Sequence, residues 1–75
     1  MANLVEFFFD SEYADEETFI DYFTDCDDET GDIIVSIHKV EDELVENLTD
    51  EELCKHFGLN PKYLNGISIN EDWDE

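Results

Sequence analysis

Residues 10–32 contain eleven carboxylates and neither Lys nor Arg. Most solvent-exposed helices mix both charge signs, because an i, i+4 pair of opposite sign stabilises a helix by about 0.2–0.5 kcal/mol. Every close charge pair in this segment repels instead. The imbalance extends to the whole chain, which has 23 acidic residues, three basic residues and a formal net charge of −20. Such a chain can fold only with its carboxylates at the surface, around an apolar core.

The apolar content is high enough for that core. Disorder needs low hydrophobicity together with high charge, but 41% of these residues are hydrophobic and 13% are aromatic. A chain of 75 residues has room for one core. We therefore predict a single acidic α+β domain over residues 1–70 and an acidic tail over residues 71–75. The predicted core residues are Phe7, Phe8, Phe9, Phe19, Tyr22, Phe23, Ile33, Ile34, Val35, Ile37, Leu44, Phe57 and Tyr63.

The first half of the chain is predicted to form a strand, a helix and a second strand. Residues 4–9 and 33–37 are short, apolar and β-prone. Residues 14–25 between them have helical spacing. In that helix, three apolar side chains share one face (Phe19, Ile20, Phe23), and three carboxylates form an i, i+4 row on another (Glu17, Asp21, Asp25).

The second half is predicted to be mainly helical. Apolar residues recur at helical spacing over residues 40–48, and Thr49 with Glu52 forms a capping box that starts another helix. Gly58 ends this helix, and Asn60-Pro61 starts one further turn. An edge strand is predicted at residues 67–69. The expected fold is α+β, a small antiparallel sheet of two or three strands covered by three or four short helices.

The sequence gives little support to metal or catalytic chemistry. Acids alternate over residues 25–32, as in an EF-hand loop, but Thr30 and Ser36 stand where that loop needs Gly and Glu. Cys54 and His56 would face different sides of a helix, and the acidic surroundings disfavour a thiolate. We predict that Cys54 is a core residue, and that the protein is not an enzyme and has neither cofactor nor dedicated metal site.

Residues 52–64 resemble the core of a helix-turn-helix. Cys54, Gly58 and Leu64 have the spacing of the small residue, turn glycine and later aliphatic residue of that family. The resemblance implies two packed helices and contact with DNA. However, a DNA-reading helix needs cationic and amide side chains, and Gly66 shortens this one. A degenerate helix-turn-helix regulator is therefore a further alternative.

The chain combines the acidic segment of residues 10–32 with a short aromatic core and a second acidic cluster, Asp42, Glu43, Glu46, Asp50 and Glu51. In these general properties, rather than in any motif, it resembles small phage inhibitors of nucleic-acid enzymes. Anti-CRISPR, anti-restriction and glycosylase-inhibitor proteins belong to this class. The resemblance implies a stoichiometric inhibitor that occupies the basic DNA-binding channel of a CRISPR effector or another DNA-processing enzyme. Its carboxylates would take the place of phosphates, which such channels meet with Lys and Arg.

This function predicts a basic nucleic-acid-binding protein as partner, and no direct contact with nucleic acid or membrane. Leu4–Phe9 is too short for a signal segment and no run approaches a membrane span, so we expect a soluble protein of the cytoplasm, bacterial if the chain is phage-encoded. An acidic adaptor that binds a basic protein without DNA mimicry is the alternative.

Tyr13, Tyr22 or Trp73 is predicted to be the apolar anchor. The predicted contact carboxylates are Glu12, Asp15, Glu17, Asp21, Asp25, Asp27, Asp28, Glu29, Asp42, Glu43, Glu46, Asp50 and Glu51.

Overall fold

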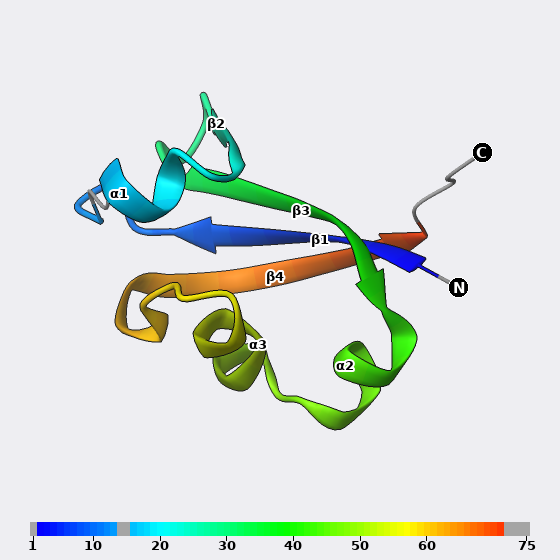
Figure 1. Ribbon diagram of the computed structural model, residues 1–75. Helices are drawn as coiled ribbons and strands as arrows, with labels where there is room; N and C mark the ends of the chain where they lie inside the picture. Colours follow the sequence, from blue (N-terminus) through cyan, green and yellow to red (C-terminus); the bar gives the residue numbers. More distant parts are fainter. Residues whose placement is uncertain (1, 14–15, 72–75) are drawn as a thin grey trace.

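The computed structural model describes residues 2–13 and 16–71 and contains one four-stranded antiparallel sheet (Figure 1). The strands, in the order β2–β3–β1–β4, are β1 (Ala2–Phe9), β2 (Phe23–Cys26), β3 (Ile33–Glu41) and β4 (Leu64–Glu71). The helices are α1 (Glu16–Phe19), α2 (Asp42–Asn47), α3 (Asp50–His56) and a 3-10 turn, η1 (Pro61–Tyr63). The α+β class is confirmed, but the sheet has more strands than the two or three predicted. Glu71, the first residue of the tail predicted over residues 71–75, is the last residue of β4.

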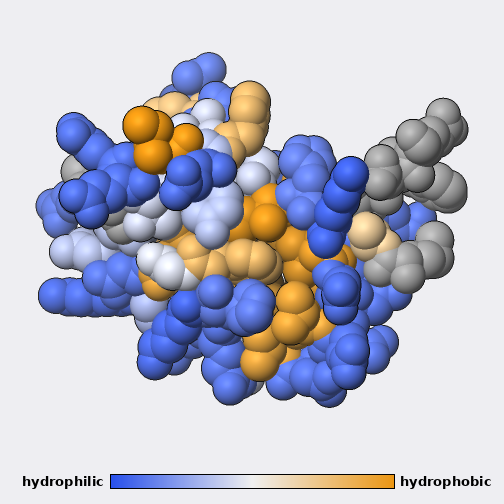
Figure 2. Space-filling model, in the orientation of Figure 1, coloured by the Kyte–Doolittle hydropathy of each residue, from blue (hydrophilic) through white to orange (hydrophobic). Residues whose placement is uncertain are grey.

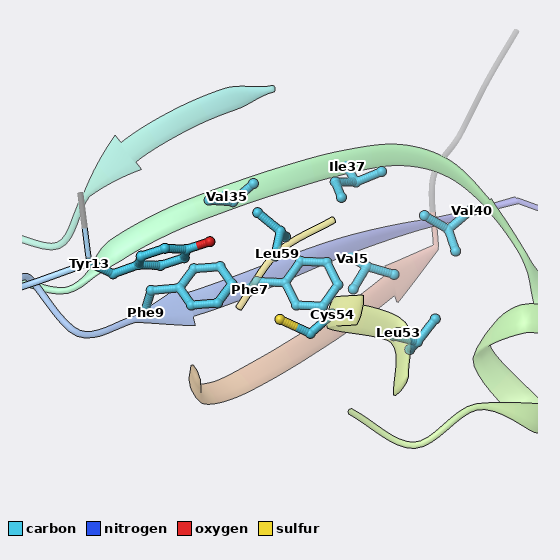
Figure 3. Packing of buried hydrophobic residues seen from close by; sticks show 10 residues of the cluster. All are labelled: Val5, Phe7, Phe9, Tyr13, Val35, Ile37, Val40, Leu53, Cys54 and Leu59. Atoms are coloured by element: carbon cyan, nitrogen blue, oxygen red, sulfur yellow. The ribbon is translucent and has the colours of Figure 1, made fainter. Parts of the chain in front are cut away.

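One face of the sheet carries the core. Side chains alternate along β1, and Val5, Phe7 and Phe9 are fully buried. Directly opposed residues of an antiparallel pair point to the same face. The partners of these three residues therefore join them on that face, Ile37, Val35 and Ile33 from β3 and Ile69, Ile67 and Leu64 from β4. The helices lie on this side of the sheet (Figure 1), and Figure 3 shows Leu53, Cys54 and Leu59 against the same side chains.

Several predicted core residues belong to the other face. Phe8 and Ile34 oppose each other on the face away from the helices and are only partly buried. Phe23 opposes Ser36 on that face, at the edge strand β2, and is 68% exposed. The prediction of a core position for Phe23 was wrong, because it assumed that this residue lay on the buried side of a helix.

A β-bulge changes which residue of β3 enters the core. Asn3 pairs with Val40 and Val5 pairs with Ile37, so two residues of β3 oppose Leu4. Lys39 in this bulge has φ +59°, in the left-handed region. The extra residue shifts the alternation by one. As a result Val40 is buried and Lys39 is exposed, and α2 begins at Asp42 rather than at residue 40.

The predicted acidic helix over residues 14–25 was wrong. Within the described residues it shrinks to α1, a single turn of four residues that ends at Phe19. Asp21 lies in the following turn and Asp25 lies in β2, so the i, i+4 carboxylate row with Glu17 does not exist. A longer helix would have stacked like charges on successive turns. The β-prone residues after Tyr22 instead pair with β3.

The signals that bound α3 were read correctly from the sequence. Thr49 Oγ1 accepts the N–H of Glu52 at 3.3 Å, and Glu52 Oε1 accepts the N–H of Thr49 at 3.1 Å, which completes the capping box. At the other end, Gly58 has φ +80°, and the N–H groups of Gly58 and Leu59 bond back to the carbonyls of Lys55 and Cys54. This is a Schellman motif, for which glycine is preferred.

The helix-turn-helix resemblance is not realised after Gly58. Asn60 caps the single turn η1, as its sequence predicted, by accepting the N–H of Lys62 at 3.0 Å. The chain then enters β4 at Leu64. There is consequently no second α-helix in residues 52–64 that could lie in a DNA groove.

Aromatic packing closes the end of the core near α1. Tyr13 is 6% exposed and stacks on Tyr63 with ring centroids 5.0 Å apart. Its ring also meets the edges of Phe9 and Phe19. The Tyr13 hydroxyl accepts the N–H of Asn60 at 2.9 Å. The radius of gyration, 11.9 Å, lies close to the value of about 11 Å for a compact chain of this length. None of the described helices is long and apolar enough to cross a bilayer.

Candidate acidic interface

The predicted carboxylates form two groups in the structure. The N-terminal acidic cluster consists of Glu12, Glu17, Asp21, Asp25, Asp27, Asp28 and Glu29. Its members come from the turn after β1, from α1, from the turn between α1 and β2, from β2, and from the turn between β2 and β3. All are exposed except Asp27, which is partly buried. Asp15, which was predicted to belong here, lies outside the described residues.

Hydrogen bonds fix the turn between β2 and β3. The Asp27 carboxylate accepts the N–H groups of Glu29 at 2.9 Å and Thr30 at 3.4 Å. The backbone of Asp27 also exchanges bonds with Gly31 and Asp32. Asp27 therefore stabilises the turn, and the exposed carboxylates of Asp28 and Glu29 at its tip are the ones available to a partner.

The second group lies on the two C-terminal α-helices. The α2–α3 acidic cluster consists of Asp42, Glu43, Glu46, Asp50 and Glu51, and all five are exposed. Four of them lie in the first turn of a helix, where the positive end of the helix dipole favours anions. The side chain of Asn3 donates to Asp42, and this hydrogen bond lowers the pKa of the Asp42 carboxyl. The helix dipoles and this hydrogen bond therefore offset part of the repulsion among the carboxylates of this cluster.

On the helix-bearing side, the elements that carry the two clusters lie on opposite borders, whereas Asp25, which opposes Ile34, points to the other face of the sheet. Figure 1 shows α1 and β2 above the middle of the sheet and α2 and α3 below it. In the same orientation, Figure 2 shows apolar surface from the middle toward the lower edge, with mostly hydrophilic surface around it and a separate apolar patch in the upper left. On the face shown, apolar surface thus lies between the elements that carry the two clusters.

The predicted apolar anchors are engaged in the core. Tyr13 is buried. Tyr22 is partly buried and donates its hydroxyl to the carbonyl of Phe57 at 2.8 Å. Burial raises the pKa of the Tyr22 hydroxyl, and the nearby Asp21 carboxylate adds to the shift. Trp73 lies outside the described residues.

Two other apolar side chains project from the N-terminal acidic cluster. Ile20 is 83% exposed and Phe23 is 68% exposed. Both stand between carboxylates in the sequence, and a longer helix would have placed them on its buried face. Their exposure follows from the end of α1 at Phe19 and from the edge position of β2. No separate signal in the sequence indicated this exposure.

The cysteine and histidine side chains do not assemble a reactive site among the described residues. Burial raises the pKa of the Cys54 thiol to about 11, so this core residue stays protonated at neutral pH. Cys26, His38 and His56 are exposed. Over residues 2–13 and 16–71, no three His, Cys, Asp or Glu side chains converge to hold a metal ion. Comparisons of the chain with protein-family models, with curated proteins and with solved structures find no match.

Proposed function

We propose that this protein is a stoichiometric inhibitor that binds the basic channel of a DNA-processing enzyme, a CRISPR effector in the first instance. The observation that carries the proposal is the exposure of Ile20 and Phe23 within the N-terminal acidic cluster. Carboxylates at the rim of an interface mainly speed association, and a desolvated apolar anchor supplies affinity. The acidic cluster provides the charges, and Ile20 together with Phe23, which lies on the sheet face opposite the helices, provides the apolar anchors.

The chemistry of the target follows from the charge. A chain of net charge −20 repels nucleic acid and anionic lipid and attracts a groove lined with Lys and Arg. When such a groove binds nucleic acid, the cations that surround the phosphates are released. A dense carboxylate cluster would release its surrounding cations in the same way. The mimicry does not require a rigid acidic helix. The turn between β2 and β3 and the paired edge strand β2 hold their carboxylates through backbone hydrogen bonds.

The decisive experiment is DNA cleavage with an order-of-addition design. Purified CRISPR effector ribonucleoproteins, restriction endonucleases and a uracil-DNA glycosylase are each incubated with this protein before or after DNA. A mimic inhibits at equimolar amounts when it is added first, and loses effect when DNA occupies the channel. Binding alongside DNA would favour the adaptor alternative and contradict mimicry. Duplex binding by this protein alone would support the degenerate regulator.

A matched pair of variants tests which carboxylates act. Asp21→Asn with Asp28→Asn removes two charges from the N-terminal acidic cluster, and Glu41→Gln with Glu71→Gln removes two exposed charges elsewhere. Inhibition should weaken at least about tenfold for the first variant and less than about threefold for the second, because short-range pairs persist at salt that screens distant charges. Equal weakening of both would show that only net charge matters.

A further inference from the structure

The helix-bearing side of the molecule has an apolar strip between the two acidic clusters. Figure 2 shows this apolar surface in the middle of that side. Side chains from α2 and from the C-terminal end of α3 pack against the core there and remain partly exposed. They are Leu44, Val45, Leu48 and Phe57, and we call them the apolar strip.

Contacts across the molecule hold the strip in place. The hydrogen bond from Tyr22 to the carbonyl of Phe57 joins the turn between α1 and β2 to the end of α3. The Phe57 ring meets the edge of Phe7 in the core, with centroids 6.1 Å apart. The two acidic borders and the apolar surface between them are thus parts of one packed unit. A partner would meet a preformed surface, which lowers the ordering cost of binding.

The charges on both borders define the occupant. The N-terminal acidic cluster lies on one side, and on the other side the α2–α3 acidic cluster outweighs Lys55 in the last turn of α3. An amphipathic helix with an apolar face flanked by cations matches such a surface, since its apolar side chains meet the strip and its cations meet both borders. A second copy of this chain would add another charge of −20, and an anionic bilayer would also be repelled.

We propose that the apolar strip is the docking site for a cationic amphipathic helix of a protein partner. This inference rests on the proposed function and adds the element of the target that would be recognised. It also predicts that the α2–α3 acidic cluster contacts the target together with the N-terminal one. A partner that binds only the N-terminal acidic cluster would leave α2 and α3 free.

Two fluorescent peptides of one composition test the proposal on the unmodified protein. Both contain only Leu and Lys, and one orders them as an amphipathic helix whereas the other scrambles them so that no apolar face forms. At physiological salt, anisotropy titration should give at least about tenfold tighter binding of the amphipathic peptide, a difference of about 1.4 kcal/mol. Equal affinities would show that charge alone attracts the peptides and would overturn the proposal.

Charge-matched variants then locate the site. Val45→Lys places a cation in the strip, and Ser68→Lys places the same charge on the opposite face, where Ser68 opposes Glu6 at the sheet edge away from β2. Val45→Lys should weaken the amphipathic peptide at least about tenfold, and Ser68→Lys less than about threefold. The reverse order would place docking on the open sheet face and overturn the proposal. Circular dichroism checks folding, and Leu44→Lys replaces Val45→Lys if that variant unfolds.

The outcome is separable from that of the proposed function. If Val45→Lys inhibits a DNA-processing enzyme as well as the unmodified protein does, the docking site is wrong and the inhibitory function stands. If the peptides behave as expected but no DNA-processing enzyme is inhibited, the docking site stands and the proposed target class is wrong.

Discussion

The bulge in β3 leads to a stability prediction at Lys39. This residue has φ +59°, and a left-handed conformation costs an L-residue with a Cβ about 1–2 kcal/mol. Glycine removes that cost but loses about 0.5–1 kcal/mol through its greater freedom in the unfolded chain. We therefore expect Lys39→Gly to stabilise the fold by about 0.5–1 kcal/mol, which raises Tm by about 2–8 °C for a domain of this size.

The substitution also removes one of three basic residues, so it needs a control. Lys39→Gln removes the same charge and keeps a Cβ in the left-handed region, and should be no more stable than the unmodified protein. Urea denaturation followed by circular dichroism, at one fixed ionic strength, gives the free energy of unfolding of all three proteins. The reasoning is refuted if Lys39→Gly is not more stable than Lys39→Gln. In that case the bulge would relax without strain, and conformation would not limit stability there.

Four further measurements test the charges and contacts of the fold. Raising NaCl from about 10 to 300 mM should increase Tm, since screening weakens repulsion among the surface carboxylates; a fall in Tm would contradict this. Ellman's reagent should label Cys26 in the folded protein and Cys54 only in urea, because burial keeps the Cys54 thiol protonated. Two equally fast thiols would be inconsistent with the core. Tyr22→Phe should lower the free energy of unfolding by about 0.5–1.5 kcal/mol, through loss of a 2.8 Å hydrogen bond. An unchanged free energy would show that the hydrogen bond between Tyr22 and the end of α3 does not stabilise the fold. The hydrogen bond from Asn3 lowers the pKa of Asp42 below its ordinary value of 3.8, so Asp42 stabilises the fold above that pH and less as pH falls through its folded pKa. The stability difference from Asp42→Asn should thus shrink in acid, and a difference independent of pH would contradict this.

The electrostatic part of the candidate site was predictable, and its apolar part was not. The sequence placed carboxylates at the surface because charged groups are costly to bury, and the described members of the predicted set are exposed except Asp27. Ile20 and Phe23 were assigned to the wrong environment. Their exposure depends on where α1 ends and on pairing of β2 with a strand seven residues further along the chain.

Local hydrogen bonding explains which features of the fold could be predicted from the amino-acid pattern. The limits of α3 and the start of η1 depend on residues a few positions apart, Thr49 with Glu52, Gly58 with Lys55 and Asn60 with Lys62, so the amino-acid pattern encodes them directly. The sign of the surface charge follows from composition alone. By contrast, three features arise from tertiary packing: the pairing of residues 23–26 with β3, the bulge that buries Val40, and the apolar strip between the two acidic clusters. These features depend on pairing and packing between separate segments of the chain, which local propensity does not contain.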